Sequence, residues 1–406
     1  MKIKYILLNI SVLYVVFCTA FAQTLTINEV LNAMHKDSLK RTVQELQDFN
    51  SRLCTKTVGQ NRQVAQYLVE RLKKYGIKNA HIDSFYVSGT HWLVGEYAQY
   101  MYNVKGRLSG TGNTDSTVII GAHLDAIAYT KPDYLPTEFV PGADDNATGC
   151  ALMIEMARIF HKFNITPSAN IDFMAYDAEE IGLLGSYYDA KKRKANNENI
   201  IVMLNNDMVG NQPDDKVWEV SLRWYDNSLD VTEKTEQALR YFTKVKPVRA
   251  DSPNSTGSDS YPYFVENYKV NFAIEQNFSP YYHSANDLTE FLNFAYFREM
   301  AKMNFVLLDY YAGVRLPLNI KSDSERDLQS IEVFPNPASE VIRIHNNNGI
   351  SVSKIDIFDL SGKCLYALQT TEQNQNIMNI AHLSSGIYFL RIHTDIGIVN
   401  KKIIKK

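Results

Sequence analysis

Between residues 38 and 315 the chain alternates short apolar segments, typical of buried strands, with longer segments of helical periodicity. The apolar segments are 117–121, 171–176, 200–205 and 271–275, and the helical segments are 60–75, 147–163, 183–193, 229–241 and 294–311. Strands separated by helices pair in parallel, and the helices cover both faces of the resulting sheet. The alternation therefore predicts an α/β fold with a mostly parallel central sheet.

The pattern changes after residue 315. Residues 316–328 are polar and without periodicity, which is typical of a linker. Residues 329–406 then contain short alternating segments such as 341–345 and 355–358, with turn sequences at Ser361-Gly362 and Ser385-Gly386. This part of the chain predicts a second domain, a small all-β sandwich.

The N-terminus has the features of a secretory signal peptide. Lys2 and Lys4 precede an apolar run over 6–17, and Ala20 and Ala22 form an A-x-A cleavage site. The run is shorter than the ~20 apolar residues that a membrane-spanning helix needs. We therefore expect residues 1–22 to be removed and the mature protein to have no stable membrane span.

Charge argues against nucleic-acid binding, since the net charge of the whole chain is −3. Segment 23–328 has 32 basic and 39 acidic residues, which suits a site that gathers cations. Once the signal peptide is removed, Cys54, Cys150 and Cys364 remain. An odd number of cysteines leaves at least one thiol without a partner in the chain, and the sequence leaves their pairing open.

Acidic residues and histidines follow the predicted strands, where ligands bind in open α/β sheets. They are His123 and Asp125 in GAHLD, Asp145 in PGADDNATG, Glu179 and Glu180 in YDAEEIGLLGS, Asp207 in LNNDMVG, and His283 in SPYYHSANDL. Singly, each has an ordinary structural interpretation as a helix cap, an acidic first turn or a buried histidine. Together they predict a metal site.

Imidazole and carboxylate ligands without thiolate suit zinc, or another divalent ion such as manganese or cobalt. Asp125 lies two residues after His123 and is placed to accept a hydrogen bond from its ring. The residue types leave open which of Asp144 and Asp145 is the ligand. The sequence lacks H-E-x-x-H, G-x-S-x-G and G-x-x-x-x-G-K-[ST], which argues against thermolysin-like, serine-hydrolase and nucleotide-hydrolysing chemistry.

These motifs, in this order, make segment 38–315 similar to the secreted di-zinc aminopeptidases of the bacterial leucyl aminopeptidase and aminopeptidase Y type. The resemblance implies the zinc exopeptidase fold, with residues 23–315 as the catalytic domain. It also implies two zinc ions and the following roles: Asp145 bridges both ions, His123 and Asp207 complete one site, Glu180 and His283 complete the other, and Glu179 is the general base. The implied substrates are peptides or proteins with a free N-terminus.

Tyr282 stands beside His283, where its hydroxyl could stabilise the oxyanion or its ring could form a wall of the pocket. We expect the pocket to involve the loops around 126–139, 217–224 and 252–263. Aromatic residues of these loops, among them Tyr129, Tyr134, Phe139 and Trp224, suggest apolar substrate side chains.

Two other enzyme classes and one non-enzymatic class compete with this interpretation. Glutaminyl cyclases share the fold and most ligands but use one zinc and carry a tryptophan-containing insertion after the glutamate pair; here the chain runs directly from Glu180 to Gly185-Ser186. A carboxypeptidase-type enzyme would need a basic pocket, for which Arg223 and Arg249 are candidates. A non-catalytic binding module predicts a damaged ligand set, whereas the set here is complete.

Residues 329–406 resemble the C-terminal sorting domain of the type IX secretion system, through EVFPNPASEVIRI, DLSGK, LSSGIYFLRI and the terminal KKIIKK. The resemblance implies the type IX secretion machinery as a partner. It also implies a secreted or cell-surface protein that passes through the periplasm.

Overall fold

The structure is a computed structural model that describes residues 25–55, 60–112, 115–213, 216–317, 331–345, 352–360, 363–369, 377–394 and 397–406. These residues form two compact units, of which the first ends at Pro317. The predicted signal peptide, the turn at Ser361-Gly362 and residues 318–328 of the predicted linker lie outside the described residues. Within the described ranges, no helix is long and apolar enough to cross a membrane.

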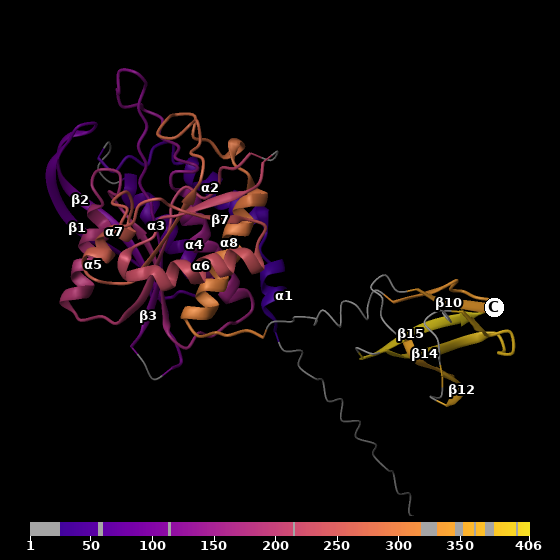
Figure 1. The fold of residues 1–406 in the computed structure, drawn as a ribbon. Helices are drawn as coiled ribbons and strands as arrows, with labels where there is room; N and C mark the ends of the chain where they lie inside the picture. Colours follow the sequence, from indigo (N-terminus) through magenta and orange to yellow (C-terminus); the bar gives the residue numbers. More distant parts are fainter. Residues whose placement is uncertain are drawn as a thin grey trace, which may run out of the picture. The chain divides into compact units, whose positions relative to one another are not determined.

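An eight-stranded sheet, in the order β1-β2-β4-β3-β5-β8-β6-β7, forms the centre of the first unit (Figure 1). Its strands are β1 (His81–His91), β2 (Gly95–Leu108), β3 (Thr117–His123), β4 (Asn170–Tyr176), β5 (Ile200–Asn206), β6 (Glu219–Leu222), β7 (Lys246–Arg249) and β8 (Val270–Glu275). The four predicted strands are β3, β4, β5 and β8, and they pair in parallel at the middle of the sheet. The prediction of a mostly parallel central sheet is confirmed.

The edges of the sheet differ from this pattern. β2 is antiparallel to both β1 and β4, and β6 is antiparallel to β8. The three-residue connection between β1 and β2 allows only an antiparallel hairpin. β1 is largely exposed, so its sequence lacks the apolar run that marks the central strands.

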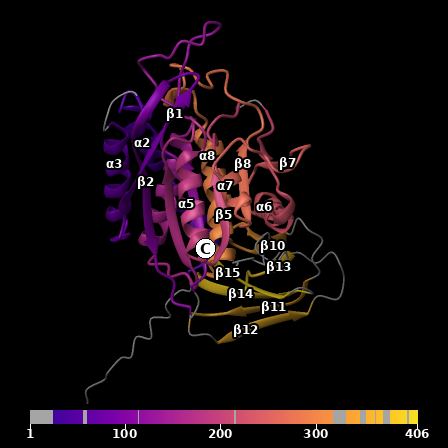
Figure 2. The same ribbon diagram turned by 90° about the vertical axis from the view of Figure 1, so that its left-hand side faces the viewer.

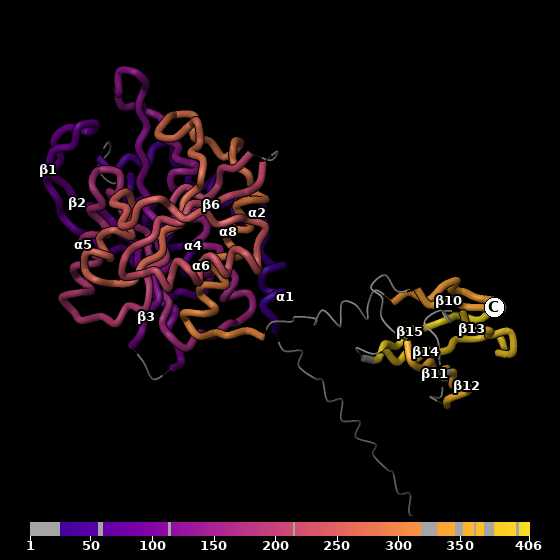
Figure 3. Tube along the Cα trace, viewed as in Figure 1, coloured from indigo at the N-terminus to yellow at the C-terminus, as the bar shows by residue number. Residues whose placement is uncertain are grey.

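Helices cover both faces of this sheet (Figure 2). They are α1 (Ile27–Asn32), α2 (Lys36–Gln47), α3 (Gln60–Lys74), α4 (Ala147–Lys162), α5 (Leu184–Ala195), α6 (Leu229–Phe242), α7 (Ser260–Val265) and α8 (Phe294–Tyr311). Helices α3, α4, α6 and α8 share the larger apolar core with one face, and α5 and α7 share the smaller core with the other. The indigo α2 packs beside the orange α8, which joins the two ends of this unit (Figure 3).

Helix α4 is held against the sheet at its first turn. The side chain of Asn146 caps the helix by accepting a hydrogen bond from Gly149 N at 2.9 Å. A Cβ atom at Gly149 would lie 2.4 Å from the backbone oxygen of Asn206, so this position requires glycine. The loop that precedes α4 is thereby fixed beside the end of β5.

A buried ion network on the other face stabilises α5. The guanidinium of Arg193 is fully buried and contacts the carboxylates of Asp172 (2.8 Å), Glu198 (2.9 Å) and Asp189. The substitution Arg193→Met leaves buried carboxylates with fewer partners, so we expect the free energy of unfolding to fall by about 3–5 kcal/mol in urea denaturation. The neighbouring control Lys192→Met removes an exposed pair with Asp83 and should cost less than about 1 kcal/mol. Equal losses in the two variants would contradict this role of Arg193.

The second unit is all-β, as predicted. One sheet has the order β13-β10-β9 and the other β12-β11-β14-β15. The strands are β9 (Glu332–Phe334), β10 (Val341–His345), β11 (Val352–Phe358), β12 (Cys364–Gln369), β13 (Ile377–Asn379), β14 (Gly386–Thr394) and β15 (Gly397–Lys405). Ile342 of the first sheet and Ile357 and Leu390 of the second share one buried core, so the sheets form a sandwich.

Cys54, Cys150 and Cys364 are free thiols. Cys54 and Cys150 are buried and Cys364 is exposed. The stability of both units therefore comes from their apolar cores and hydrogen bonds.

Candidate metal centre

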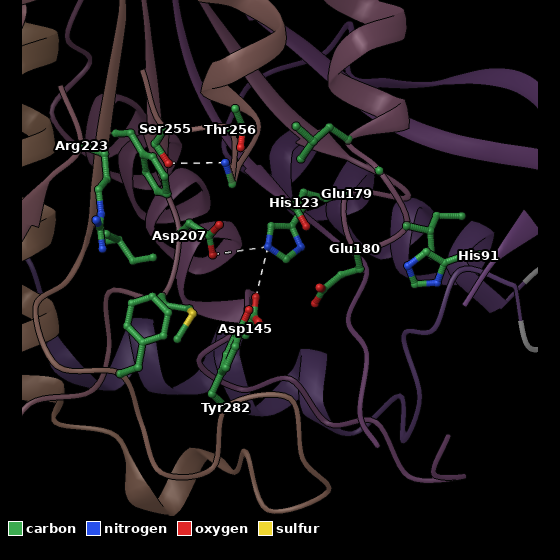
Figure 4. A pocket seen from close by; sticks show the side chains of 18 residues that line it. His91, His123, Asp145, Glu179, Glu180, Asp207, Arg223, Ser255, Thr256 and Tyr282 are labelled. Carbon is green, nitrogen blue, oxygen red and sulfur yellow. Dashed lines mark hydrogen bonds and ion pairs between the residues drawn. The ribbon is translucent and has the colours of Figure 1, made fainter. Parts of the chain in front are cut away.

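The predicted site residues meet at the carboxyl ends of the parallel strands. Figure 4 shows His123, Asp145, Glu179, Glu180 and Asp207 among them. His123 is the last residue of β3, Glu179 and Glu180 follow β4, and Asp207 directly follows β5. Asp145 comes from the loop before α4, and His283 comes from the loop after β8. The parallel order of the strands brings these segments, far apart in sequence, to one edge of the sheet.

Asp145 lies between the two histidines. Its Oδ1 is 3.2 Å from Nε2 of His123, and its Oδ2 is 3.0 Å from Nε2 of His283. Nε2 of His123 is also 3.4 Å from Oδ1 of Asp207, and Nε2 of His283 is 3.1 Å from Oε2 of Glu180. The donors thus form two groups that share Asp145.

The donor geometry fits metal ions. Among the described residues, Nε2 of His283 has no hydrogen-bond partner, although two carboxylate oxygens face it within 3.1 Å. Donor atoms of His123, Asp145 and Glu180 lie within 4.8 Å of one another, as do those of His123, Glu179 and Asp207. Nitrogen and oxygen donors in this number suit zinc.

The crowded carboxylates also favour a cation electrostatically. Burial lowers the pKa of His283, but the charges of Glu180 and Asp145 outweigh burial and raise that pKa to about 11. Burial, followed by the charge of Asp145, raises the pKa of Glu180 to about 7. Burial raises the pKa of Glu179 well above its usual range. Without a metal ion, protons must therefore offset the negative charge of the site.

Asp125 supports the centre in a different way from the one predicted. Nδ1 of His123 is 3.1 Å from the backbone oxygen of Asp125 and 3.6 Å from its Oδ1, so the ring faces the main chain rather than the carboxylate. The carboxylate instead accepts the backbone N–H groups of Glu179 (3.0 Å) and Glu180 (3.2 Å). Asp125 therefore orients the glutamate pair as well as the histidine.

Sequence reasoning missed three supporting residues. Asp287 accepts the backbone N–H of Asp145 at 3.0 Å, and the hydroxyl of Ser258 donates to Oδ2 of Asp207 at 2.7 Å. Arg52 is buried and donates to the backbone oxygen of Gly142 at 2.6 Å. Asp287 stands inside the motif of His283, which is a usable sequence feature, whereas Ser258 and Arg52 contact the site only through tertiary structure.

All the donors except His283 line a cavity of about 610 Å³. The other lining residues include His91, Ile181, Gly182, Leu183, Met208, Arg223, Ser255, Thr256, Gly257, Phe272, Ile274, Phe278 and Tyr282. Two of the expected loops thus contribute, but no residue of 126–139 lines the cavity. The expectation that the loop around 126–139 takes part in the pocket is wrong, and Tyr129, Tyr134, Phe139 and Trp224 do not line the cavity.

Contacts explain where two of these aromatic residues lie instead. The indole N–H of Trp224 donates to the backbone oxygen of Ala250 at 2.9 Å. The ring of Tyr129 packs against the rings of Trp92 and His283, with centroid separations of 5.6 and 5.7 Å. Tyr129 therefore packs against His283 and does not line the cavity.

Tyr282 stacks on His283 with ring centroids 3.7 Å apart and also lines the cavity. Burial raises the pKa of its hydroxyl, so the group stays protonated and able to donate. This position is compatible with either role considered from the sequence.

Comparisons with known proteins agree with this architecture. A probable leucine aminopeptidase of Arthroderma otae is 27% identical over 286 residues, which cover 68% of this chain and 73% of the relative. The LapA aminopeptidase of Legionella pneumophila has a similar fold, with a TM-score of 0.59 at 20% identity over 70% of this chain and 72% of that one. A glutaminyl cyclase of Bacteroides thetaiotaomicron, bound to N-acetylhistamine, also shares the fold, with a TM-score of 0.55 at 17% identity over 68% of this chain and 98% of that one.

Family models match both units. Residues 103–308 match the model of peptidase family M28, and residues 332–406 match that of the secretion system C-terminal sorting domain. The first match includes the predicted donors and the central strands of the sheet. The chain therefore belongs to peptidase family M28, as a peptide-bond hydrolase with a C-terminal sorting domain.

Proposed function

We propose that the chain is a secreted metallo-aminopeptidase that holds two zinc ions at the carboxyl edge of its sheet. The observation that carries the proposal is the position of Asp145, which turns one carboxylate oxygen toward each histidine. In this assignment His123 and Asp207 would complete one zinc site. Glu180 and His283 would complete the other.

When bound, zinc would supply Lewis-acid chemistry by polarising the scissile carbonyl and making water more acidic. Glu179 is then the group that moves the proton. No hydrogen bond to its carboxylate comes from the described part of the chain, while its backbone N–H is held by Asp125. The carboxylate is thus positioned but free to take a proton from the attacking water and pass it to the nitrogen of the leaving amine.

The acidic residues of the site favour a substrate with a free N-terminus. A free α-amine carries a positive charge that the carboxylates of the site attract, whereas an acetylated N-terminus does not. The leucine aminopeptidase relative supports this direction of cleavage. We therefore infer that the enzyme removes residues one at a time from the N-terminus.

Glutaminyl cyclisation is the second function that this fold accommodates. The donor set, which is complete for two zinc ions, favours the peptidase, because glutaminyl cyclases use one zinc. A peptide with N-terminal glutamine separates the two activities by mass: cyclisation removes ammonia, and peptidase action removes the whole residue.

Zinc titration tests the proposal. The chelator-treated protein is resupplied with zinc, and bound zinc and peptide cleavage are measured together by plasma mass spectrometry and product analysis. We expect full activity only when about two equivalents are bound. Full activity at one equivalent would contradict the two-zinc assignment.

We further propose that residues 329–406 direct export to the medium or cell surface through type IX secretion. A chain that lacks these residues should keep its kcat/KM but accumulate inside the cell, because the metal centre lies entirely in the first unit. Immunoblots of the medium and of cell fractions, with activity assays on each, measure both results. A truncated chain that folds but has lost activity would instead make the tail part of the catalytic machinery.

A further inference from the structure

Arg223 lines the cavity but has no role in the proposed chemistry. Arg223 directly follows β6, and its backbone N–H donates to the oxygen of Phe272 at 2.9 Å, which fixes it to the neighbouring strand β8. Its half-buried side chain lines the cavity that contains the metal donors.

The guanidinium of Arg223 forms no hydrogen bond or ion pair with any residue in the ranges that the structure describes. Other arginines of this unit are paired: Arg107 with Asp172 at 2.6 Å, Arg193 with the same carboxylate at 2.8 Å, and Arg249 with Glu236 at 2.9 Å. An arginine in a cavity wall without an acidic partner is available to a ligand that brings its own carboxylate.

The surroundings of Arg223 are those of a side-chain pocket. Met208, Phe272, Ile274 and Phe278 supply apolar surface in the same cavity. Figure 4 shows Arg223 and Ser255 on the Asp207 side of the metal donors. Apolar surface and one cation in the same cavity fit a short chain of methylene groups that ends in a carboxylate.

The opposite side of the cavity offers a route for the rest of the substrate. His91 lies there, on the side of Glu180 (Figure 4), and the next residue, Trp92, is 63% exposed at the hairpin between β1 and β2. A peptide whose carbonyl lies at the metal donors can therefore extend toward the hairpin while its first side chain points toward Arg223.

We propose that Arg223 is a specificity residue that binds the side-chain carboxylate of an N-terminal glutamate or aspartate. The proposal rests on the aminopeptidase function above and gives that function a substrate class. It departs from the expectation of an apolar preference that the loop aromatics suggested.

The test compares kcat/KM of the zinc-loaded full-length protein on peptides of the form X-Ala-Ala-amide, with X as Glu, Gln or Leu. Glutamine has nearly the shape of glutamate without its charge, so the Glu-to-Gln ratio isolates the carboxylate. We expect the wild-type ratio to exceed 1 and to fall about tenfold to hundredfold in Arg223→Met, with the leucine peptide changing by less than about threefold. Arg223→Lys should retain part of the preference.

Arg249→Met is the matched control, since it removes one positive charge on the neighbouring strand outside the cavity lining. It should leave the Glu-to-Gln ratio unchanged. An unchanged ratio in Arg223→Met, or an equal loss in both variants, would overturn the proposal.

The C-terminus of a short peptide is another carboxylate that Arg223 could bind. Comparing Leu-Ala-Ala as a free acid with the same peptide as an amide tests for binding of this C-terminal carboxylate. If Arg223→Met abolishes a preference for the free acid and leaves the Glu-to-Gln ratio intact, Arg223 binds the C-terminus and the proposal is wrong. Release of leucine by the wild-type protein keeps these outcomes separate from a failure of the aminopeptidase function, which would show as no cleavage of any peptide.

Discussion

Glu179→Gln is expected to lower kcat by about 10²–10⁴-fold while the protein keeps the zinc content of the wild type. Glutamine preserves the shape of the side chain and the backbone N–H that Asp125 holds at 3.0 Å, but it cannot accept a proton. Binding of the substrate should therefore change little. Steady-state kinetics and zinc analysis on the same preparation measure both parts of this prediction.

Glu180→Gln is the matched variant because it changes the adjacent carboxylate in the same way. Oε2 of Glu180 lies 3.1 Å from Nε2 of His283, so its loss should reduce zinc content as well as activity. The donor atoms of Glu179 also lie within reach of His123 and Asp207. Loss of zinc from Glu179→Gln would therefore make Glu179 a metal ligand and remove it as the proton carrier.

Asp145→Ala should abolish both zinc binding and peptide cleavage. No other described side chain places one oxygen 3.2 Å from Nε2 of His123 and another 3.0 Å from Nε2 of His283. Without it, each group of donors keeps one imidazole and one carboxylate, which is fewer than the three protein ligands that catalytic zinc sites use. Zinc per chain after gel filtration, with circular dichroism as a check of folding, measures the effect.

Asp144→Asn is the control, one residue away and equally buried. Oδ1 of Asp144 accepts the backbone N–H of Gly210 at 2.9 Å, and an asparagine oxygen can accept the same bond. Zinc content should remain that of the wild type. If Asp144→Asn loses zinc and Asp145→Ala keeps it, the assignment of the bridging residue is reversed.

The candidate donors could be predicted from the sequence because each follows a strand or precedes a helix, and these elements are recognisable from their local hydrophobic pattern. His123, Glu179, Glu180 and Asp207 follow buried strands that apolar runs reveal, and parallel pairing then brings them together. The residue types alone did not distinguish Asp144 from Asp145, and the expectation that Asp145 is the ligand came from the family resemblance. In the fold, Asp144 turns toward Gly210 and Asp145 toward the histidines.

Other parts of the site could not be predicted because their interactions are long-range. Arg52 reaches the loop before α4 from 90 residues away, and Ser258 reaches Asp207 from 51 residues away. Strand β1 buries only Phe85 of its eleven residues, so no alternating pattern marked it as an edge of the sheet. Aromatic residues in loops were misleading for the same reason: Trp224 satisfies its N–H on Ala250 rather than turning into the cavity.

The most direct test of the aminopeptidase function uses two forms of one peptide, with leucine at a free N-terminus or at an acetylated one. Each is incubated with the purified protein, with and without a chelator, and the products are read by mass spectrometry. We expect stepwise loss of N-terminal residues from the free peptide alone, and none in the presence of the chelator. Cleavage of the acetylated peptide, removal of C-terminal residues, or activity that survives complete removal of metal would contradict a metallo-aminopeptidase.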